Sequence, residues 1–208
     1  MNEIKKAAIS FKIRIHREWV SIDEFIDDPD YLLSYYLELG NLSRSVLQGG
    51  FFIDADGISW NNDQCVDEFK TTNTWFSAIE KLLNGVQAVE IWIGEESGLI
   101  MELNGTAIEL EYIHHSGEIV CPRVAFDFYD FVKQMLAEGR KFAMLAIMLR
   151  EAIKPLEKFN ANDIAIDAIK DKVKTLKDNL PEDLYEKIDL MEIVLEDFKK
   201  IPGTHCSP

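Results

Sequence analysis

The chain has 208 residues, 47% of them hydrophobic and 28% charged, and its 37 acidic residues against 22 basic ones give a net charge of -15. This composition is that of a folded chain long enough to bury a substantial core, not that of a disordered one. The negative charge repels phosphate backbones and anionic lipid surfaces, so neither nucleic acid nor a membrane is expected as a ligand. A basic protein would be attracted to such a surface.

The three cysteines, Cys65, Cys121 and Cys206, form no CxxC pair, and an odd number leaves one over from any disulfide scheme. This pattern predicts free thiols in a reducing compartment. The first 19 residues lack the apolar core and cleavage site of a secretory signal, and no apolar run has the length of a bilayer span. A cytoplasmic location is therefore expected.

The N-terminal third alternates strand and helix signals. Residues 8–15 alternate apolar and polar side chains, which predicts a half-buried strand. Ser21 and Glu24 match a capping box for a short helix, and the aromatic segment 31–39 is interpreted as a helix, with a strand as the alternative. Asp56-Gly57 then joins two short apolar runs, which predicts a β-hairpin.

The middle of the chain contains the clearest β pattern. Thr72 to Thr74 offer caps for a helix that Gly85 ends. Three segments that alternate apolar and polar side chains follow, over residues 86–94, 98–105 and 106–115. Turn residues lie between them, including Asn104-Gly105. They predict a meander. A further strand over 118–125 is expected at an edge or to end early, because Pro122 lacks an N–H.

Beyond Asp127 the period becomes helical. One helix is expected to close at Gly139, and a second to run from Arg140 to Ala152 or Lys158, with Pro155 as a kink or stop. Two more helices, from Asn162 and from Pro181, predict a helical hairpin.

Strands before helices predict an α+β class: an antiparallel meander and hairpin sheet packed with helices, followed by a C-terminal helical hairpin. The expected division is an α+β domain over 1–158, a helical hairpin over 159–200 packed on the same domain, and a loose tail over 201–208.

Two groups of residues in the sequence could be metal ligands. Asp54, Asp56, Asn61 and Asp63 resemble the start of a calcium loop, but glycine and the bidentate acid fall at the wrong positions, so a hairpin turn is favoured. His114 and His115 are adjacent on a strand and would point to opposite faces, which argues against a shared zinc ion unless the strand ends between them.

Catalytic and nucleotide fingerprints are missing from the sequence. It contains neither a GxSxG elbow, nor a phosphate loop, nor a GxGxxG motif. No catalytic residue, metal or cofactor is predicted.

Large aromatic residues among carboxylates can anchor a basic partner, although core packing explains them more simply and is favoured. They are Trp60, Trp75, Trp92, Tyr31, Tyr35 and Tyr36.

The meander AVEIWIGEESGLIMELNGTAIELEY, followed by the amphipathic segment FDFYDFVKQMLAEGRKFAMLAIMLREA, resembles in character and order the immunity proteins of bacterial polymorphic-toxin systems. The likeness spans about residues 45–155 and involves no diagnostic motif. It implies a small α+β inhibitor without a catalytic site that binds and blocks a cognate toxin.

The first hypothesis is accordingly a non-enzymatic protein-binding module with a basic partner. The surface expected to bind it comprises Glu90, Trp92, Glu95, Glu96, Glu102, Glu109 and Glu111.

Two other hypotheses stay open. One is an enzyme of unrecognised family that uses carboxylates and His114 or His115 for acid/base chemistry in a cleft between sheet and helices. The other is an oligomeric scaffold whose C-terminal hairpin exposes Ile169, Val173, Ile188 and Leu195 to a second copy.

Overall fold

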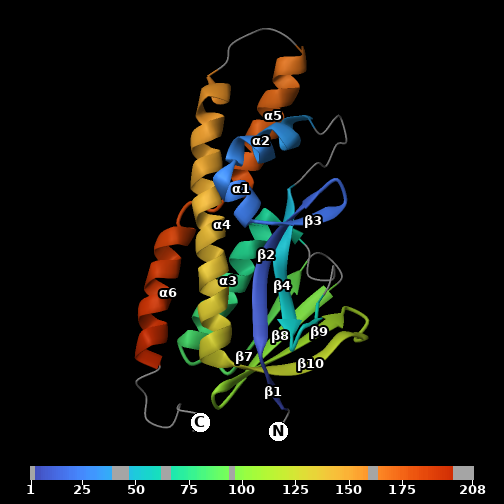
Figure 1. Ribbon diagram of the computed structural model, residues 1–208, viewed down its shortest axis with the longest axis vertical. Helices are drawn as coiled ribbons and strands as arrows, with labels where there is room; N and C mark the ends of the chain where they lie inside the picture. The colour runs from blue at the N-terminus through green and yellow to red at the C-terminus, as the bar shows by residue number, and fades with distance from the viewer. Residues whose placement is uncertain (1–2, 39–46, 62–66, 94–96, 159–163, 199–208) are drawn as a thin grey trace.

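The computed structural model describes residues 3–38, 47–61, 67–93, 97–158 and 164–198. Two β-sheets and a layer of helices share one hydrophobic core (Figure 1). Sheet A has the strand order β1-β10-β9-β8-β7, and sheet B has the order β3-β2-β4-β5, with β6 pairing separately with β4. The predicted α+β class with antiparallel sheets and a C-terminal helical hairpin is confirmed.

Sheet A contains the predicted meander. Its strands are β7 (Ala88–Ile93), β8 (Ser97–Asn104), β9 (Ala107–His114) and β10 (Ile119–Asp127), all paired antiparallel in chain order, and β1 (Ile4–Lys5), parallel to β10. The turn between β8 and β9 lies one residue later than expected, at Gly105 and Thr106, and Gly105 takes a positive φ of 66°.

Sheet B is a second sheet that the sequence interpretation merged with the first. It consists of β2 (Ala7–Ile15), β3 (Glu18–Ser21), β4 (Gln48–Ala55), β5 (Ile58–Ser59) and β6 (Asp67–Glu68). The hairpin at Asp56-Gly57 is confirmed, and both residues have positive φ, as a type I′ turn requires. The turn after β2 also has positive φ, at His16 and Arg17, and there the His16 N–H donates to the Tyr35 hydroxyl at 3.0 Å.

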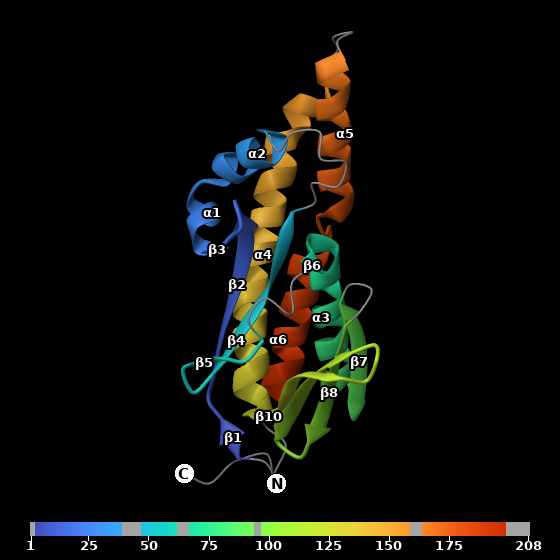
Figure 2. The same cartoon turned by 90° about the vertical axis from the view of Figure 1, so that its right-hand side faces the viewer.

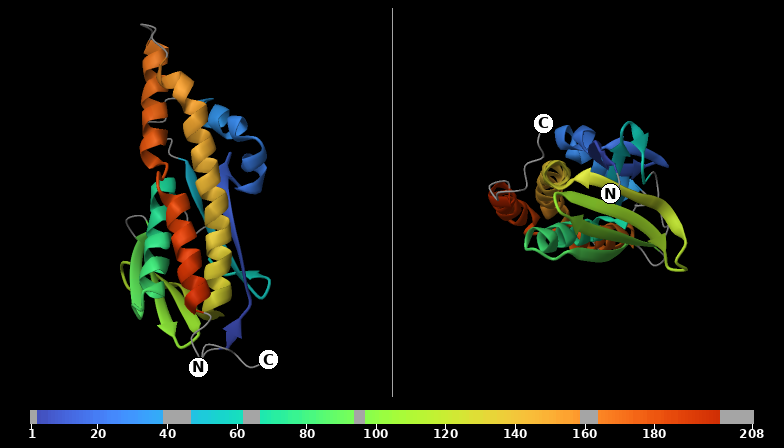
Figure 3. Two further views of the ribbon diagram at one scale, coloured as in Figure 1. Left: turned by 90° about the vertical axis from the view of Figure 1, so that its left-hand side faces the viewer. Right: turned by 90° about the horizontal axis from the view of Figure 1, so that it is seen from below.

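Six helices complete the described chain: α1 (Asp23–Asp27), α2 (Pro29–Glu38), α3 (Phe69–Leu83), α4 (Phe128–Glu157), α5 (Ile164–Asn179) and α6 (Leu184–Phe198). Helix α4 runs along most of the long axis of the molecule and contacts both sheets (Figures 1 and 2). Helix α5 lies beside its C-terminal half and α6 beside its N-terminal half (Figure 3). α4 is therefore the element on which the others assemble.

The prediction that a helix ends at Gly139 is wrong, because α4 continues through it as one helix of 30 residues. A Cβ atom at Gly139 would lie 2.2 Å from Phe76 Cζ and 3.2 Å from Ile188 Cδ1. This glycine permits α3 and α6 to pack closely against α4, which is a tertiary requirement and not a helix stop. Pro155 lies in the last turn, two residues before the end of α4.

Two helix starts also differ from the predictions. Helix α3 begins at Phe69, so Thr72 is a buried residue inside it and not its cap. At α1 the cap position is Ile22, without a side-chain cap, and the expected capping box is absent there. The predicted end of α3 is confirmed, because Gly85 has a φ of 88° and Val86 N–H donates to Lys81 O, as in a Schellman motif.

Side chains of α4 satisfy one edge of β2. Gln134 lies against the part of the β2 edge that β3 does not cover. Its Oε1 accepts a hydrogen bond from Ile9 N–H at 3.1 Å, and its Nε2 donates one to Ala7 O at 3.1 Å. One turn later, Glu138 Oε2 accepts from Phe11 N–H at 2.9 Å. The helix therefore replaces the neighbouring strand that β2 lacks here.

Glu138 is 9% exposed, and a lysine of the same helix pairs with its negative charge. Lys141 Nζ lies 2.7 Å from its Oε1 and 2.9 Å from Asp23 Oδ1, so the lysine links α4 to α1. Burial alone would lower the pKa of Lys141, but its hydrogen bonds to Glu138 and Asp23 outweigh burial and raise it. The hydrogen bond from Lys141 lowers the pKa of Asp23.

Asn61 satisfies the opposite edge of sheet B. Its fully buried amide accepts from Ile53 N–H at 2.8 Å and donates to Phe51 O at 2.7 Å, as a strand residue would. The adjacent Trp60 donates through Nε1 to Pro122 O at 2.8 Å, which joins sheet B to sheet A. Asn61, considered as a calcium ligand in the sequence, is thus a structural residue.

The C-terminal hairpin packs on the rest of the chain. Val173 and Leu176 of α5 are buried, as are Leu184, Ile188, Met191 and Leu195 of α6. Arg140 of α4 pairs with Asp189 and Glu192 of α6, at 2.7 and 2.6 Å.

We expect Gly139→Ala to destabilise the fold. Alanine gains about 1 kcal/mol of helix propensity, but overpacking costs about 1–3 kcal/mol, and a contact of 2.2 Å with a buried ring favours the upper part of that range. The expected net loss, measured by urea unfolding, is about 1–2 kcal/mol. Combining the change with Phe76→Leu, which removes the obstructing atoms, should recover part of it; a Gly139→Ala protein as stable as the parent would contradict the close approach.

A second prediction concerns the edge of β2. Glu138→Ala leaves the Phe11 N–H without its acceptor and should cost about 1–3 kcal/mol of unfolding free energy. Glu138→Gln keeps an acceptor oxygen and should cost less. Amide hydrogen exchange at Phe11 is the direct measurement, expected to accelerate in the alanine variant only. Equal exchange in both variants would show that charge, and not the hydrogen bond, is what the carboxylate contributes.

Candidate functional site

The face of sheet A turned away from the helices is the candidate site. Along β7, β8 and β9 the residues alternate: most inward ones are buried, and most outward ones are half-buried or exposed, with Gly98 and Ala107 as buried exceptions. The inward set comprises Val89, Ile91, Leu99, Met101, Ile108, Leu110 and Tyr112. Because α3 and α4 cover the inner face, the outer face is left for other contacts (Figure 3).

Most of the predicted partner-binding residues lie on this outer face. Register places Glu90 of β7 beside Ile100 of β8, and Ile100 beside Glu111 of β9. Glu102 of β8 lies directly opposite Glu109 of β9. Glu95 and Glu96 lie outside the described residues. The structure thus gathers five of the seven predicted residues, Glu90, Trp92, Glu102, Glu109 and Glu111, on one surface.

Trp92 is the large aromatic residue of this face and is 46% exposed. It pairs with Gly98, which has no side chain, and a Cβ atom there would lie 3.6 Å from the Cε3 and Cζ3 atoms of the indole. The same position would lie 3.6 Å from Ile113 of β9. The ring therefore covers the glycine, which fixes its position while leaving nearly half of it in solvent.

Arg123 of β10 binds three of the carboxylates. Its guanidinium lies 2.8 Å from Glu102, 3.4 Å from Glu109 and 3.3 Å from Glu111. Two glutamates directly opposite each other on paired strands repel, and this arginine offsets that repulsion. One positive charge against three carboxylates, with the exposed Glu90 nearby, leaves the face negative.

Arg123 was missed in the sequence because its partners come from two other strands. The available signal was its place beside Pro122, where β10 is irregular: the register against β9 shifts on either side of Cys121. Pro122 was expected at an edge or an early end. The strand does not end early, because it continues to Asp127, but Pro122 lies in an irregular stretch before β1 pairs at Ala125 and Phe126, where one side of β10 is an edge. The irregularity lets Pro122 be accommodated without a ladder hydrogen bond.

His114 and His115 lie where β9 ends, so the strand does end between them. Their ring centroids are 4.2 Å apart, and His114 Nδ1 lies 2.9 Å from the Ser116 hydroxyl. Among the described residues, no group of three or more His, Cys, Asp or Glu side chains is placed to hold a metal ion.

The other aromatic candidates divide between core and surface. Trp60, Trp75 and Tyr36 are buried. Tyr31 is half exposed on α2, where its ring stacks on Phe25. Core packing therefore accounts for three of the six aromatic candidates, and Trp92 is the one that shares a face with the acidic strands.

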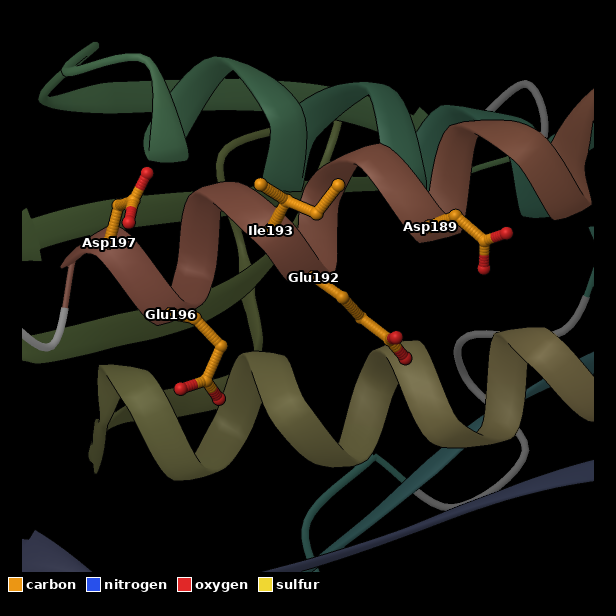
Figure 4. A pocket seen from close by; sticks show the side chains of 5 residues that line it. All are labelled: Asp189, Glu192, Ile193, Glu196 and Asp197. Carbon is orange, nitrogen blue, oxygen red and sulfur yellow. The ribbon is translucent and has the colours of Figure 1, made fainter.

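A second acidic surface, which sequence analysis did not single out, lies on α6. Asp189, Glu192, Ile193, Glu196 and Asp197 line a shallow hollow of about 420 Å³ (Figure 4). Arg140 pairs with Asp189 and Glu192, and the Tyr129 hydroxyl donates to Glu196 at 2.7 Å. Figure 4 shows Glu192 and Glu196 directed toward α4. These carboxylates fasten α6 to α4, which is a structural role.

The residues expected to mediate self-association are mostly unavailable for it. Val173, Ile188 and Leu195 are buried within the chain, and Ile169 alone of the four is exposed. These three residues pack inward, whereas α6 exposes Leu190, Ile193 and Val194 to solvent. Within the described residues, none of the helices combines the length and the apolar character of a bilayer span.

Comparisons of this chain with protein-family models, curated proteins and solved structures found no match.

The buried Cys121 provides a prediction about reactivity. Burial raises the pKa of its thiol to about 11. In a Cys65→Ser/Cys206→Ser variant, the remaining thiol should react with iodoacetamide at neutral pH about a hundredfold more slowly than it does in urea, since little thiolate forms. Mass spectrometry of the alkylated protein follows the rate. Equal rates in native and unfolded protein would show that the thiol is accessible and ionises normally.

Proposed function

We propose that this chain is a non-enzymatic protein-binding module whose partner is basic and docks on the outer face of sheet A. The observation that carries the proposal is the half-exposed Trp92, held in place over Gly98 beside a carboxylate-rich surface. Tryptophan is enriched among the residues that dominate binding energy at interfaces. Exposed carboxylates around it would steer a basic partner to the face and select against acidic ones.

A toxin-neutralising immunity protein is the specific form of this proposal. Its support is the resemblance in segment order, together with the net charge of -15. An inhibitor needs a rigid complementary surface, and a sheet face backed by a continuous core is rigid. Under this proposal, inhibition comes from covering a basic toxin surface and needs no chemistry by the inhibitor.

The test is a capture experiment with matched variants. The tagged chain is incubated with lysate of its native cell at low salt, and the affinity of the recovered protein is then measured by calorimetry at two salt concentrations. Glu90→Lys/Trp92→Ser should weaken binding by at least about tenfold, because it reverses a charge and removes the aromatic anchor. Binding should also weaken as salt rises.

The control is Glu186→Lys/Leu190→Ser on α6. It makes the same change in net charge and also removes an exposed apolar side chain, but on α6, a helix that does not belong to the sheet face (Figure 3). It should bind like the parent. Equal loss in both variants would mean that net charge alone drives capture, and no loss in the sheet variant would refute the proposed face.

A further inference from the structure

The free edge of β7 is the feature that carries a further inference. Sheet edges expose unpaired backbone groups, and this fold covers several of them. Gln134 and Glu138 cover β2, Asn61 covers β4, and β1 pairs along β10. Strand β7 ends the order of sheet A, and in Figures 2 and 3 it forms the margin of the sheet.

The register shows which backbone groups of β7 point outward. Leu103 N–H donates to Gln87 O at 2.7 Å, so the backbone of residue 87 faces β8. Backbone direction alternates along a strand, hence Val89 and Ile91 also face β8. The N–H and C=O groups of Ala88, Glu90 and Trp92 therefore point away from the sheet. Within the part of the chain that the structure describes, no hydrogen bond reaches them.

The side chains of these three residues are exposed as well. The edge therefore presents a run of free donors and acceptors with an acid at its centre and Trp92 at one end. The outer face of sheet A continues directly from it. A segment lying along β7 would complete backbone hydrogen bonds and reach the proposed binding face at the same time.

Charge argues against a second copy as the occupant. An antiparallel β7 pair that uses all three outward residues places Glu90 opposite Glu90 of the other copy, and an in-register parallel pair does the same. Like charges directly opposite on paired strands destabilise the pairing. A lysine or arginine opposite Glu90 would instead attract it and stabilise the pairing.

We propose that an extended basic segment of the partner adds to sheet A antiparallel to β7, with a lysine or arginine opposite Glu90. The proposal rests on the proposed function and specifies how the partner engages. Main-chain hydrogen bonds to Ala88, Glu90 and Trp92 provide affinity, and Glu90 and Trp92 provide selectivity.

The first experiment uses a short synthetic peptide in which lysine alternates with valine, in two N-methylated isomers. In an antiparallel pair with lysine opposite Glu90, the lysine N–H groups point to β7 and the valine N–H groups point away. Methylation at the lysines should weaken binding at least about tenfold relative to methylation at the valines. The two isomers have the same charge and composition, so electrostatic adhesion alone cannot separate them.

Hydrogen exchange identifies the site. On binding the valine-methylated peptide, the amides of Ala88, Glu90 and Trp92 should become protected, whereas those of Val89 and Ile91 are already bonded to β8. Equal affinity of the two isomers, or protection elsewhere, would overturn strand addition. So would a dimer of the free chain, seen by sedimentation, that protects the same three amides, because β7 would then accept its own copy.

The second experiment uses the partner captured above. Ala88→Pro removes one outward N–H, and Ala88→Thr keeps it; Ala88 is on an exposed edge, where proline is tolerated. Only the proline variant should lose affinity, by several-fold. If Glu90→Lys/Trp92→Ser weakens binding but Ala88→Pro does not, strand addition is wrong and the protein-binding function stands. If neither change matters, both proposals are wrong.

Discussion

The hydrogen bonds between the side chains of α4 and the backbone of β2 are the interaction on which this architecture depends. Gln134 and Glu138 take the place of a neighbouring strand, which fixes the position of α4 against sheet B. Phe142, one turn farther along α4, stacks on Phe11 at 4.9 Å between ring centroids. The hydrogen bonds and this apolar contact therefore hold α4 in the same position against β2. Sheet A and the C-terminal hairpin then pack against the same helix, and Phe76 of α3 approaches it at Gly139.

Local features of the fold were predictable because neighbouring residues determine them. The type I′ turn at Asp56-Gly57 and the glycine cap at Gly85 follow from backbone conformations that few residues adopt. The meander over β7 to β9 follows from alternation, and the helical hairpin from a period of 3.6. The candidate face was partly predictable for the same reason, since alternation alone placed Glu90 and Trp92 on one side of a strand.

Features that depend on residues distant in sequence were not predictable. Gly139 looked like a helix stop, and its real constraint is Phe76 on another helix. Asn61 was considered as a calcium ligand and set aside in favour of a hairpin turn, and its amide in fact completes a strand edge. Arg123 carried only the neighbouring Pro122 as a local signal, and its three carboxylate partners come from β8 and β9. In each case the residue type was compatible with several roles, and its role depends on contacts with residues that are distant in sequence.

The hydrogen bond between Phe11 and Glu138 joins residues 127 positions apart. During synthesis from the N-terminus, β2 therefore emerges long before the helix that covers its edge. Sheet A joins mainly consecutive strands and can form earlier, whereas β2 waits with unpaired backbone groups until α4 has left the ribosome. For this chain the interval of translation between those two elements is the period of greatest exposure to misassembly, and chaperones would be needed most at that stage.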